Sequence, residues 1–327
     1  MSAVRRLPTS ADVARAAGVS RSTVSYVLNA TPGARVAEAT RKRVLATADE
    51  LGYVPNMAAA DLRRGTSRII LTVIERRRAA HVITEFMSSI ADELNASGFT
   101  MLTLQVSGEV TGEDARSLAT LRPAVVFSVG THFSAEARKV FKRSEVVLIG
   151  EYEADVRWFF DQGQIAVAGA QALLERGRTG ILQILPDDPS LAEFTAPRVA
   201  AFADVTGPLG LGTVHLPLGP ELAAFVQELP KTRPTCDGLV VHNDEYAALV
   251  VGALLDARID VPARMSVVGV DNTAWGAWMR PALSTLSIAS STFVASIAGA
   301  VMATLSGEQG RELRVDTAVS VVHRQTT

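Results

Sequence analysis

The chain has 327 residues, of which 48% are hydrophobic and 20% are charged, and its formal net charge is −2. This length exceeds one compact core and this hydrophobic content excludes a disordered chain, so two or three globular domains are expected. The single cysteine, Cys236, excludes an intramolecular disulfide framework and is typical of a reducing compartment.

Charge is distributed unevenly along the chain. Residues 1–68 carry 11 basic and 5 acidic side chains, whereas the remainder carries 21 basic and 29 acidic. A basic head on an acidic body indicates that the head binds a polyanion. The first residues lack the apolar core of a signal peptide, and the longest smooth apolar stretch, 293–305, is too short to span a bilayer. We therefore expect a cytoplasmic, nucleoid-associated protein with no membrane partner.

Residues 10–29 predict two short helices joined by a tight turn. Thr9 is a good N-cap for the first helix, and Gly18 follows it where a left-handed residue is needed to end a helix. Ser20 can cap a second helix that begins at Arg21. Small and apolar residues at helical spacing, with the glycine turn between them, are the specific pattern of a helix-turn-helix.

The outer face of the second helix is polar. Such side chains can form hydrogen bonds to base edges or phosphates, although an ordinary helical hairpin also has a polar outer face. The basic charge of the head favours DNA binding. The residues of this face are Arg21, Ser22, Ser25, Tyr26 and Asn29.

A third helix is predicted from about Ala37 to Leu51. Its apolar residues Val44, Leu45, Ala48 and Leu51 are expected to face inward. The basic run 41–43 could be a solvated face, but beside a DNA-reading helix it favours phosphate contacts.

Residues 55–66 are expected to form a connector whose middle is helical, and the pattern of residue types changes after it. Short β-branched apolar runs then alternate with helix-length amphipathic segments, which predicts parallel sheets covered by helices on both faces. The expected strands are 68–74, 99–106, 123–129, 145–150, 180–185, 236–241 and 265–270, and the expected helices include 83–96, 163–176, 220–229 and 245–257. The fold class is therefore an all-α head followed by an α/β body with more than one doubly wound sheet.

Several blocks of the sequence resemble the lactose-repressor/galactose-repressor (LacI/GalR) family of bacterial regulators. They are DVARAAGVSRSTVSYVLN, TRKRVLATADELGYVPN and AAADLR in the head and connector, and GLVVHNDEYA, VPARMSVVGVDN and PALSTL in the body. The resemblance is strong over 9–65 and moderate beyond 155. It implies a homodimer that places two reading helices in successive major grooves of a palindromic operator.

The resemblance also implies a division of the chain and a set of DNA contacts. The head would span 1–54, the hinge 55–66 and the body 67–327; the N-subdomain would be 67–157 with 288–312, and the C-subdomain 158–287 with 313–327. A hinge helix at about 56–63 would insert Leu62 into the minor groove, although Leu62 could also be a core-facing helix residue. The expected DNA-binding residues are Thr9, Ser20, Arg21, Ser22, Thr23, Ser25, Tyr26, Asn29, Thr40, Arg41, Tyr53, Asn56 and Leu62.

The head departs from the family pattern at a few positions. Tyr26 stands where most members have arginine, and the loop 30–35 is slightly long. Ala37 replaces the usual capping serine, so the third helix should begin with a weaker cap. These departures indicate an operator that differs from those of relatives.

The family body resembles periplasmic sugar-binding proteins, in which two doubly wound subdomains hold a ligand between the carboxyl ends of their strands. Arg198 matches the family's pocket arginine, and Asp161 matches an aspartate that follows the first crossing between subdomains. Asn243 with Asp244, and Asp271 with Asn272, each follow an apolar strand, where polar groups can bind sugar hydroxyls. Trp275 and Trp278 could stack on a ring, although a tryptophan is more often a core residue. The expected effector-binding residues are Arg198, Asn243, Asp271, Trp275 and Asp161.

The loop after the first strand of the body, ERRRAAH, differs most from the family. Its arginines Arg76, Arg77 and Arg78 could bind an anionic ligand, face a dimer partner or be solvated. Catalytic motifs, cofactor fingerprints and metal-ligand spacings are absent from the sequence, so no enzyme, cofactor or metal is expected. The tail after Ser306 has no leucine heptads, which favours a dimer over a tetramer.

These observations favour an allosteric repressor controlled by a small carbohydrate-like effector. A solute-binding protein with the same body is the alternative. A doubly wound enzyme is a third possibility, but the sequence lacks the catalytic motifs of such enzymes. The effector's identity, and whether it induces or co-represses, stay open at this point.

Overall fold

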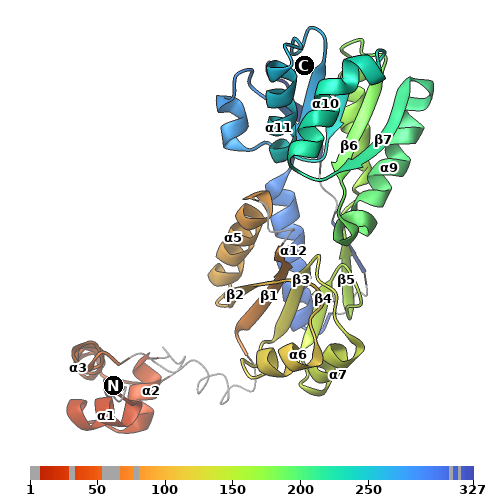
Figure 1. Ribbon diagram of the computed structural model, residues 1–327. Coiled ribbons are helices and arrows are strands. Elements are labelled where there is room, and N and C mark those ends of the chain that lie inside the picture. Colours follow the sequence, from red (N-terminus) through yellow and green to blue (C-terminus); the bar gives the residue numbers. More distant parts are fainter. Residues whose placement is uncertain (1–7, 29–33, 54–66, 77–80, 309–311, 316–317) are drawn as a thin grey trace, which may run out of the picture. The chain divides into compact units, whose positions relative to one another are not determined.

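The computed structural model describes residues 8–28, 34–53, 67–76, 81–308, 312–315 and 318–327. The chain forms two compact units, Met1–Arg68 and Ile69–Thr327, called here the head and the body (Figure 1). The predicted architecture is confirmed: a helical head and a body built on two α/β sheets. In the described part of the chain, no helix has the length and apolar character to cross a membrane. The apolar stretch 293–305 lies instead in α12, Ser290–Leu305, which packs into the body core.

The head is a three-helix unit of α1 (Ser10–Ala17), α2 (Arg21–Leu28) and α3 (Glu38–Leu51). Its core consists of small apolar residues from all three helices, which are Val13, Ala14, Ala17, Val24, Val27, Val44 and Ala48. The small side chains let the helices approach closely, which the predicted pattern required.

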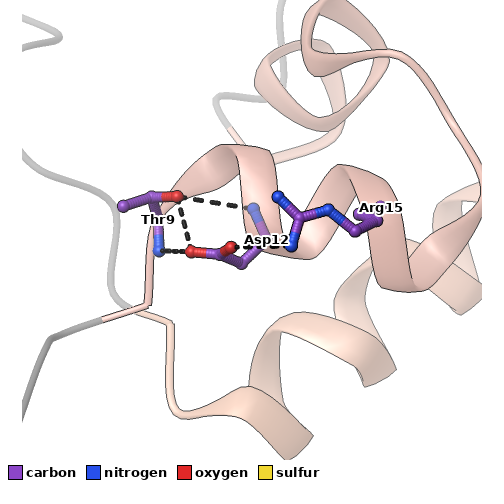
Figure 2. Close-up of polar contacts among 3 residues, drawn as sticks. All are labelled: Thr9, Asp12 and Arg15. Carbon is purple, nitrogen blue, oxygen red and sulfur yellow. Dashed lines mark hydrogen bonds and ion pairs between the residues drawn. The ribbon is translucent and has the colours of Figure 1, made fainter.

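The start of α1 is fixed by a capping box (Figure 2). The Thr9 hydroxyl oxygen accepts the backbone N–H of Asp12 at 3.4 Å, and the Asp12 carboxylate accepts the N–H and the hydroxyl of Thr9 at 2.9 and 2.7 Å. Arg15 pairs with the other carboxylate oxygen of Asp12 at 3.4 Å. Gly18 then ends the helix at φ 64, a left-handed conformation that favours glycine. These local devices set the turn between α1 and α2.

Two expectations for α3 need correction. Leu45 and Leu51 were expected to face inward, but both are exposed, and only Val44 and Ala48 are buried. Leu45 lies about 100° around the helix from Val44, and Leu51 is the last residue of the helix. The expectation of a weak start is met, because Ala37 caps α3 without a side-chain hydrogen bond.

The N-subdomain is a six-stranded sheet with helices on both faces. Its elements are β1 (Ile69–Glu75), α5 (His81–Ala96), β2 (Thr100–Val106), α6 (Gly112–Ala119), β3 (Val125–Val129), α7 (Ala135–Arg143), β4 (Val147–Gly150), β5 (Val156–Phe159), α12 and β11 (Glu312–Arg314). The strand order is β11-β5-β4-β3-β1-β2, and all pairs are parallel. Helices α5 and α12 pack on one face, and α6 and α7 on the other (Figure 1).

The C-subdomain repeats this plan. It contains α8 (Gly163–Leu174), β6 (Ile181–Pro186), η2 (Pro189–Leu191), α9 (Ala192–Thr206), η3 (Gly207–Leu209), β7 (Gly210–Leu216), α10 (Pro220–Thr232), β8 (Gly238–Val241), α11 (Asp244–Asp256), β9 (Ser266–Val270), η4 (Ala274–Trp278), β10 (Ser284–Ile288) and β12 (Val319–Val322). The order is β12-β10-β9-β8-β6-β7, parallel except for the β10–β12 pair. Helices α10 and α11 cover one face, and α8 and α9 the other.

The chain passes between the two sheets after β5, after β10 and after β11. The boundaries expected at 157 and 312 fall inside β5 and β11, and both strands belong to the N-subdomain sheet. In each sheet the strand order reverses direction beside the first strand, between β1 and β3 and between β6 and β8. Ligands of open α/β sheets bind outside the carboxyl ends of strands at such a switch point.

Candidate functional site

The outer face of α2 carries a cluster of hydroxyl groups at its start. The Ser20 hydroxyl accepts the backbone N–H of Thr23 at 3.1 Å and lies 2.7 Å from the Ser22 hydroxyl and 2.8 Å from the Thr23 hydroxyl. Arg21, Ser22 and Tyr26 are exposed, whereas Thr23 and Ser25 are half-buried. The helix thus presents a guanidinium, hydroxyls and a phenol, which are groups that can bind base edges and phosphates.

The basic run of α3 divides between two roles. Arg43 donates its Nε–H to the carbonyl oxygen of Ala17, at the C-terminus of α1, at 3.0 Å. Its guanidinium therefore joins α3 to α1, although the side chain is exposed. Arg41 and Thr40 are half-buried and Lys42 is exposed.

The other head residues expected to contact DNA differ in position. Thr9 is exposed at the start of α1. Tyr53 is half-buried and packs against the head core. Asn29, Asn56 and Leu62, with the whole predicted hinge helix, lie outside the described residues.

The body contains a cavity of about 790 Å³ between its two subdomains. This volume lies in the upper part of the range of roughly 300–1,000 Å³ that is usual for small-molecule sites. Residues that follow β1, β4, β6, β8 and β9 line it, so it opens at the carboxyl ends of both sheets. It occupies the position that the doubly wound topology predicts for a ligand.

Arg198 lies at the C-subdomain side of this cavity and is only 5% exposed. Its Nε and Nη2 donate to the Oε1 atom of Gln162 at 2.9 and 2.7 Å, and its Nη1 donates to the backbone carbonyl of His242 at 2.9 Å. The Phe194 ring centroid lies 5.6 Å from the guanidinium carbon. Arg198 is therefore held rigidly at the cleft and is not a surface arginine of α9.

The two polar pairs that follow β8 and β9 each divide between the cavity and the interior. Asn243 lines the cavity and caps α11, since its Oδ1 accepts the Tyr246 N–H at 3.0 Å. Asp244 is fully buried; its carboxylate accepts the N–H and hydroxyl of Thr273, both at 2.8 Å, and the hydroxyl of Thr285 at 2.5 Å. Burial raises the pKa of Asp244, and these hydrogen bonds oppose the shift. Asp244 thus positions the loop after β9.

Asp271 lines the cavity at the start of that loop. Its φ of 106 lies in the region that side chains rarely adopt, and such strain is concentrated at functional sites. The pKa of Asp271 is raised to about 7, first by burial and then by the Asp244 carboxylate, while the Arg198 guanidinium opposes the shift. Asn272 instead turns toward the C-terminal segment, where its Oδ1 accepts Arg324 Nη2 at 2.6 Å.

The remaining expected cleft residues have different outcomes. Trp275 lines the cavity, but Trp278 does not and is 73% exposed. Asp161, expected in the effector site, lies outside the lining of this cavity: its carboxylate accepts the N–H of Gly163, the first residue of α8, at 3.0 Å. Arg76 is exposed and lines the cavity. Arg77 and Arg78 lie outside the described residues.

The sequence did not single out Gln162, which supplies the acceptor that orients Arg198. A signal for it existed, because it directly follows Asp161, the residue chosen in its place. The aromatic side chains that line the N-subdomain side of the cavity were also missed. Among the described residues, no three His, Cys, Asp or Glu side chains are grouped so as to hold a metal ion.

Comparisons with known proteins match both units. Residues 9–56 match the family of bacterial regulatory proteins named lacI, and residues 170–327 match a periplasmic binding protein-like domain. The regulator GntR of Pseudomonas aeruginosa is 27% identical over 98% of this chain and 96% of its own length. The repressor PurR of Vibrio parahaemolyticus is 26% identical over 86% of each chain. A crystal structure of the lac repressor dimer, bound to operator and the anti-inducer ONPF, aligns with a TM-score of 0.76 and 20% identity over 98% of this chain and 99% of that one.

Proposed function

Because this chain is a LacI-family transcriptional regulator, with a lacI-type helix-turn-helix and a periplasmic-binding-protein-like body, we propose that it is a repressor that binds a palindromic operator as a homodimer. A small molecule bound in the body cavity would control that binding. The observation that carries the proposal is the rigid polar set around Arg198, which lies in the cleft of a chain that also carries an exposed DNA-reading helix.

The proposed operator contacts come from the start and outer face of α2. Arg21 would bind a guanine bidentately, and Ser22 and Tyr26 would contact the neighbouring bases and so determine which bases are preferred there. Supporting contacts to phosphates would come from Thr9, Ser20, Thr23, Ser25, Asn29, Thr40, Arg41, Tyr53 and Asn56, with Leu62 as a minor-groove wedge. The exposure of Arg21, Ser22 and Tyr26 supports this assignment.

A feature of the N-subdomain supports a dimer. Strand β2 is the edge of its sheet, and its Leu102 and Leu104 are exposed. An edge strand with exposed leucines is a surface that monomeric proteins avoid, because it promotes association. We propose that a second copy of the chain covers this edge.

The proposed effector site uses Arg198, Asn243, Asp271 and Trp275, with Gln162 as the residue that orients Arg198. Guanidinium, amide and carboxylate groups are suited to the hydroxyl groups of a carbohydrate-like molecule. The lac repressor structure contains both an operator and a small-molecule anti-inducer, which supports control of DNA binding from the body.

The proposal is tested by selecting operator sequences from random DNA and measuring their binding by fluorescence anisotropy at fixed salt. We expect a palindromic consensus. Arg21→Ala should lose ~1–3 kcal/mol of discrimination at one base pair of each half-site. Arg143→Ala, an exposed arginine of α7, is the matched control and should leave operator binding unchanged.

Two outcomes would contradict parts of the proposal. A protein that selects no DNA sequence but binds a solute would support the alternative of a solute-binding body. Leu62→Ala with unchanged operator affinity would remove the minor-groove wedge from the mechanism.

A further inference from the structure

The loop that leaves β9 begins with two residues in left-handed backbone conformations. Asp271 has a φ of 106 and its neighbour Asn272 has a φ of 49. An asparagine tolerates its angle, but side chains rarely adopt the φ of Asp271, so this conformation persists only where surrounding contacts hold it. Asp271 lines the cavity, whereas Asn272 lies outside the cavity lining. The contacts that hold this pair therefore decide how the effector site presents Asp271.

The backbone of the pair is anchored to β10 by its N–H groups. The N–H of Asp271 donates to the carbonyl of Leu286 at 2.9 Å, and the N–H of Asn272 donates to the hydroxyl of Thr285 at 3.2 Å. The Thr285 hydroxyl in turn donates to the buried Asp244 carboxylate. These bonds fix where the loop starts, but they do not reach the side chains of the pair.

The side chain of Asn272 is held by Arg324, which lies two residues after β12. Arg324 Nη2 donates to the Oδ1 atom of Asn272 at 2.6 Å, and its Nη1 donates to the carbonyl of Leu283 at 2.7 Å. The backbone N–H of Arg324 donates to the hydroxyl of Ser284, the first residue of β10, at 2.8 Å. Arg324 itself lies outside the cavity lining, so it reaches the site only through Asn272.

The segment that carries Arg324 is firmly attached to the C-subdomain sheet. Thr326 is fully buried, and its hydroxyl accepts the N–H of Ser284 and donates to the carbonyl of Val267, both at 2.8 Å. The N–H of Val267 donates back to the carbonyl of Thr326 at 2.8 Å. Arg324 therefore extends from a rigid support, which lets it hold Asn272 in one position.

The Asp271 carboxylate depends on this support because it has no comparable bond of its own. Among the described residues, no hydrogen bond to this carboxylate contributes to its pKa. Burial and the Asp244 carboxylate raise the pKa of Asp271; Arg198 opposes the shift and Glu245 adds to it. A carboxyl group in such surroundings would turn toward water if the backbone that carries it were released.

We infer that Arg324 is a positioning residue of the effector site: by holding Asn272, it keeps Asp271 in the conformation that presents its carboxylate to the cavity. The inference rests on the proposed function and adds to that site a residue that does not touch the ligand. Loss of the bond between Arg324 and Asn272 should release the Asp271 side chain toward water.

The test measures the titration of Asp271 by NMR on the full-length protein, with isotope-labelled aspartate carboxyl carbons. The signal that is absent from Asp271→Asn identifies the residue. In the parent protein we expect a midpoint at about 7, the pKa of this group in the folded body. In Arg324→Met the midpoint should fall to about 6 or below, toward the ordinary value of about 4. An effect of charge alone has the opposite sign, because Arg324 lowers the pKa of Asp244 and loss of a positive charge raises the pKa of a carboxyl group.

Two further variants separate the shape of the guanidinium from its charge. Arg324→Lys keeps the charge but replaces the planar fork with one ammonium group, so it cannot make both bonds in the same geometry. Asn272→Gly tolerates the left-handed backbone but removes the acceptor. Both should lower the midpoint of Asp271 as Arg324→Met does, and they decide the question if Arg324→Met does not fold. Arg280→Met is the matched control and should leave the midpoint unchanged, because exposed Arg280 belongs to the same loop but donates to the carbonyls of the two residues before it.

Several outcomes would overturn the inference. They are a midpoint that stays at about 7 or rises in Arg324→Met, a parent-like midpoint in both Arg324→Lys and Asn272→Gly, and an equal fall in Arg280→Met. A parent midpoint of about 4 would also overturn it, because Asp271 would then not be held in the cavity. Operator affinity is measured on the same samples without effector. A parent protein that binds no operator would count against the proposed function, whereas intact operator binding with an unchanged Asp271 midpoint would overturn only the role of Arg324.

Discussion

The raised pKa of Asp271 makes the cleft a source of pH-dependent stability. In the unfolded chain this carboxyl group has an ordinary pKa near 4, whereas in the folded body its pKa is raised to about 7. Unfolding therefore releases a proton between about pH 4 and pH 7, and the contribution of Asp271 to stability falls as the pH rises through this window. Above pH 7 the loss is complete, because the carboxylate is ionised in both states.

The size of this change in stability follows from the difference between the folded and unfolded pKa of Asp271. Three pKa units correspond to at most about 4 kcal/mol, and between pH 5 and pH 8 the change is about 2–3 kcal/mol. Asp271→Asn removes the ionisation while keeping the shape of the side chain, and asparagine tolerates the positive φ of this position. The variant should therefore be more stable than the parent protein at pH 8 by a larger margin than at pH 5.

Thermal unfolding of both proteins at the two pH values measures this difference. A change of about 2 kcal/mol corresponds to ~4–8 °C in the midpoint of a domain of this size. Asp204→Asn, an exposed site outside the cavity, controls for the loss of one carboxylate. A margin that is equal at pH 5 and pH 8 would refute the reasoning that Asp271 is protonated in the folded cleft at low pH.

Three further predictions concern the positioning of the two sites, and each is measured by thermal unfolding. Ala37→Ser should stabilise the head by ~1 kcal/mol because it adds the missing N-cap of α3; an unchanged midpoint would contradict this. Arg43→Met should destabilise the head by ~1 kcal/mol through loss of its bond to the last carbonyl of α1, while Lys42→Met has no such effect. Gly269→Ala should destabilise the body by ~1–3 kcal/mol, because the added Cβ would collide with the Asp244 carboxylate. An unchanged midpoint would show that the hydrogen-bonded Asp244 carboxylate can shift without cost.

Most strands that could be predicted from the sequence are buried on both faces; β2, an exposed edge strand, was predicted as well, whereas the buried start of β10 was missed. A central parallel strand needs apolar residues on both sides, so its sequence is a recognisable apolar run. This holds for β1, β3, β4, β6, β8 and β9. Strands β7, β11 and β12 were missed because they are edge strands, in which no residue is fully buried. Strand β5 was missed for a similar reason, since Arg157 and Phe159 alternate with buried neighbours.

Cleft residues were predictable as pairs but not as individuals. Asn243 and Asp244 follow a buried strand, as do Asp271 and Asn272, yet only the first member of each pair lines the cavity. The choice depends on hydrogen bonds from distant segments, namely those of Thr273 and Thr285 to Asp244 and of Arg324 to Asn272. The aromatic side chains that line the N-subdomain side of the cavity could not be predicted for the same reason, because α5, β5 and α12 meet there only in the folded N-subdomain.

A short segment of the chain connects the two sides of the cleft. Strand β5 places Arg157 and Phe159 on the N-subdomain side, and Gln162, three residues after Phe159, orients Arg198 on the C-subdomain side. This segment is one of three that join the subdomains, and a relative movement of the subdomains changes how the two binding surfaces are arranged. A ligand that contacts Arg198 and the N-subdomain side of the cavity together therefore has different affinities for different arrangements of the subdomains, which is the thermodynamic requirement for allosteric control of the head.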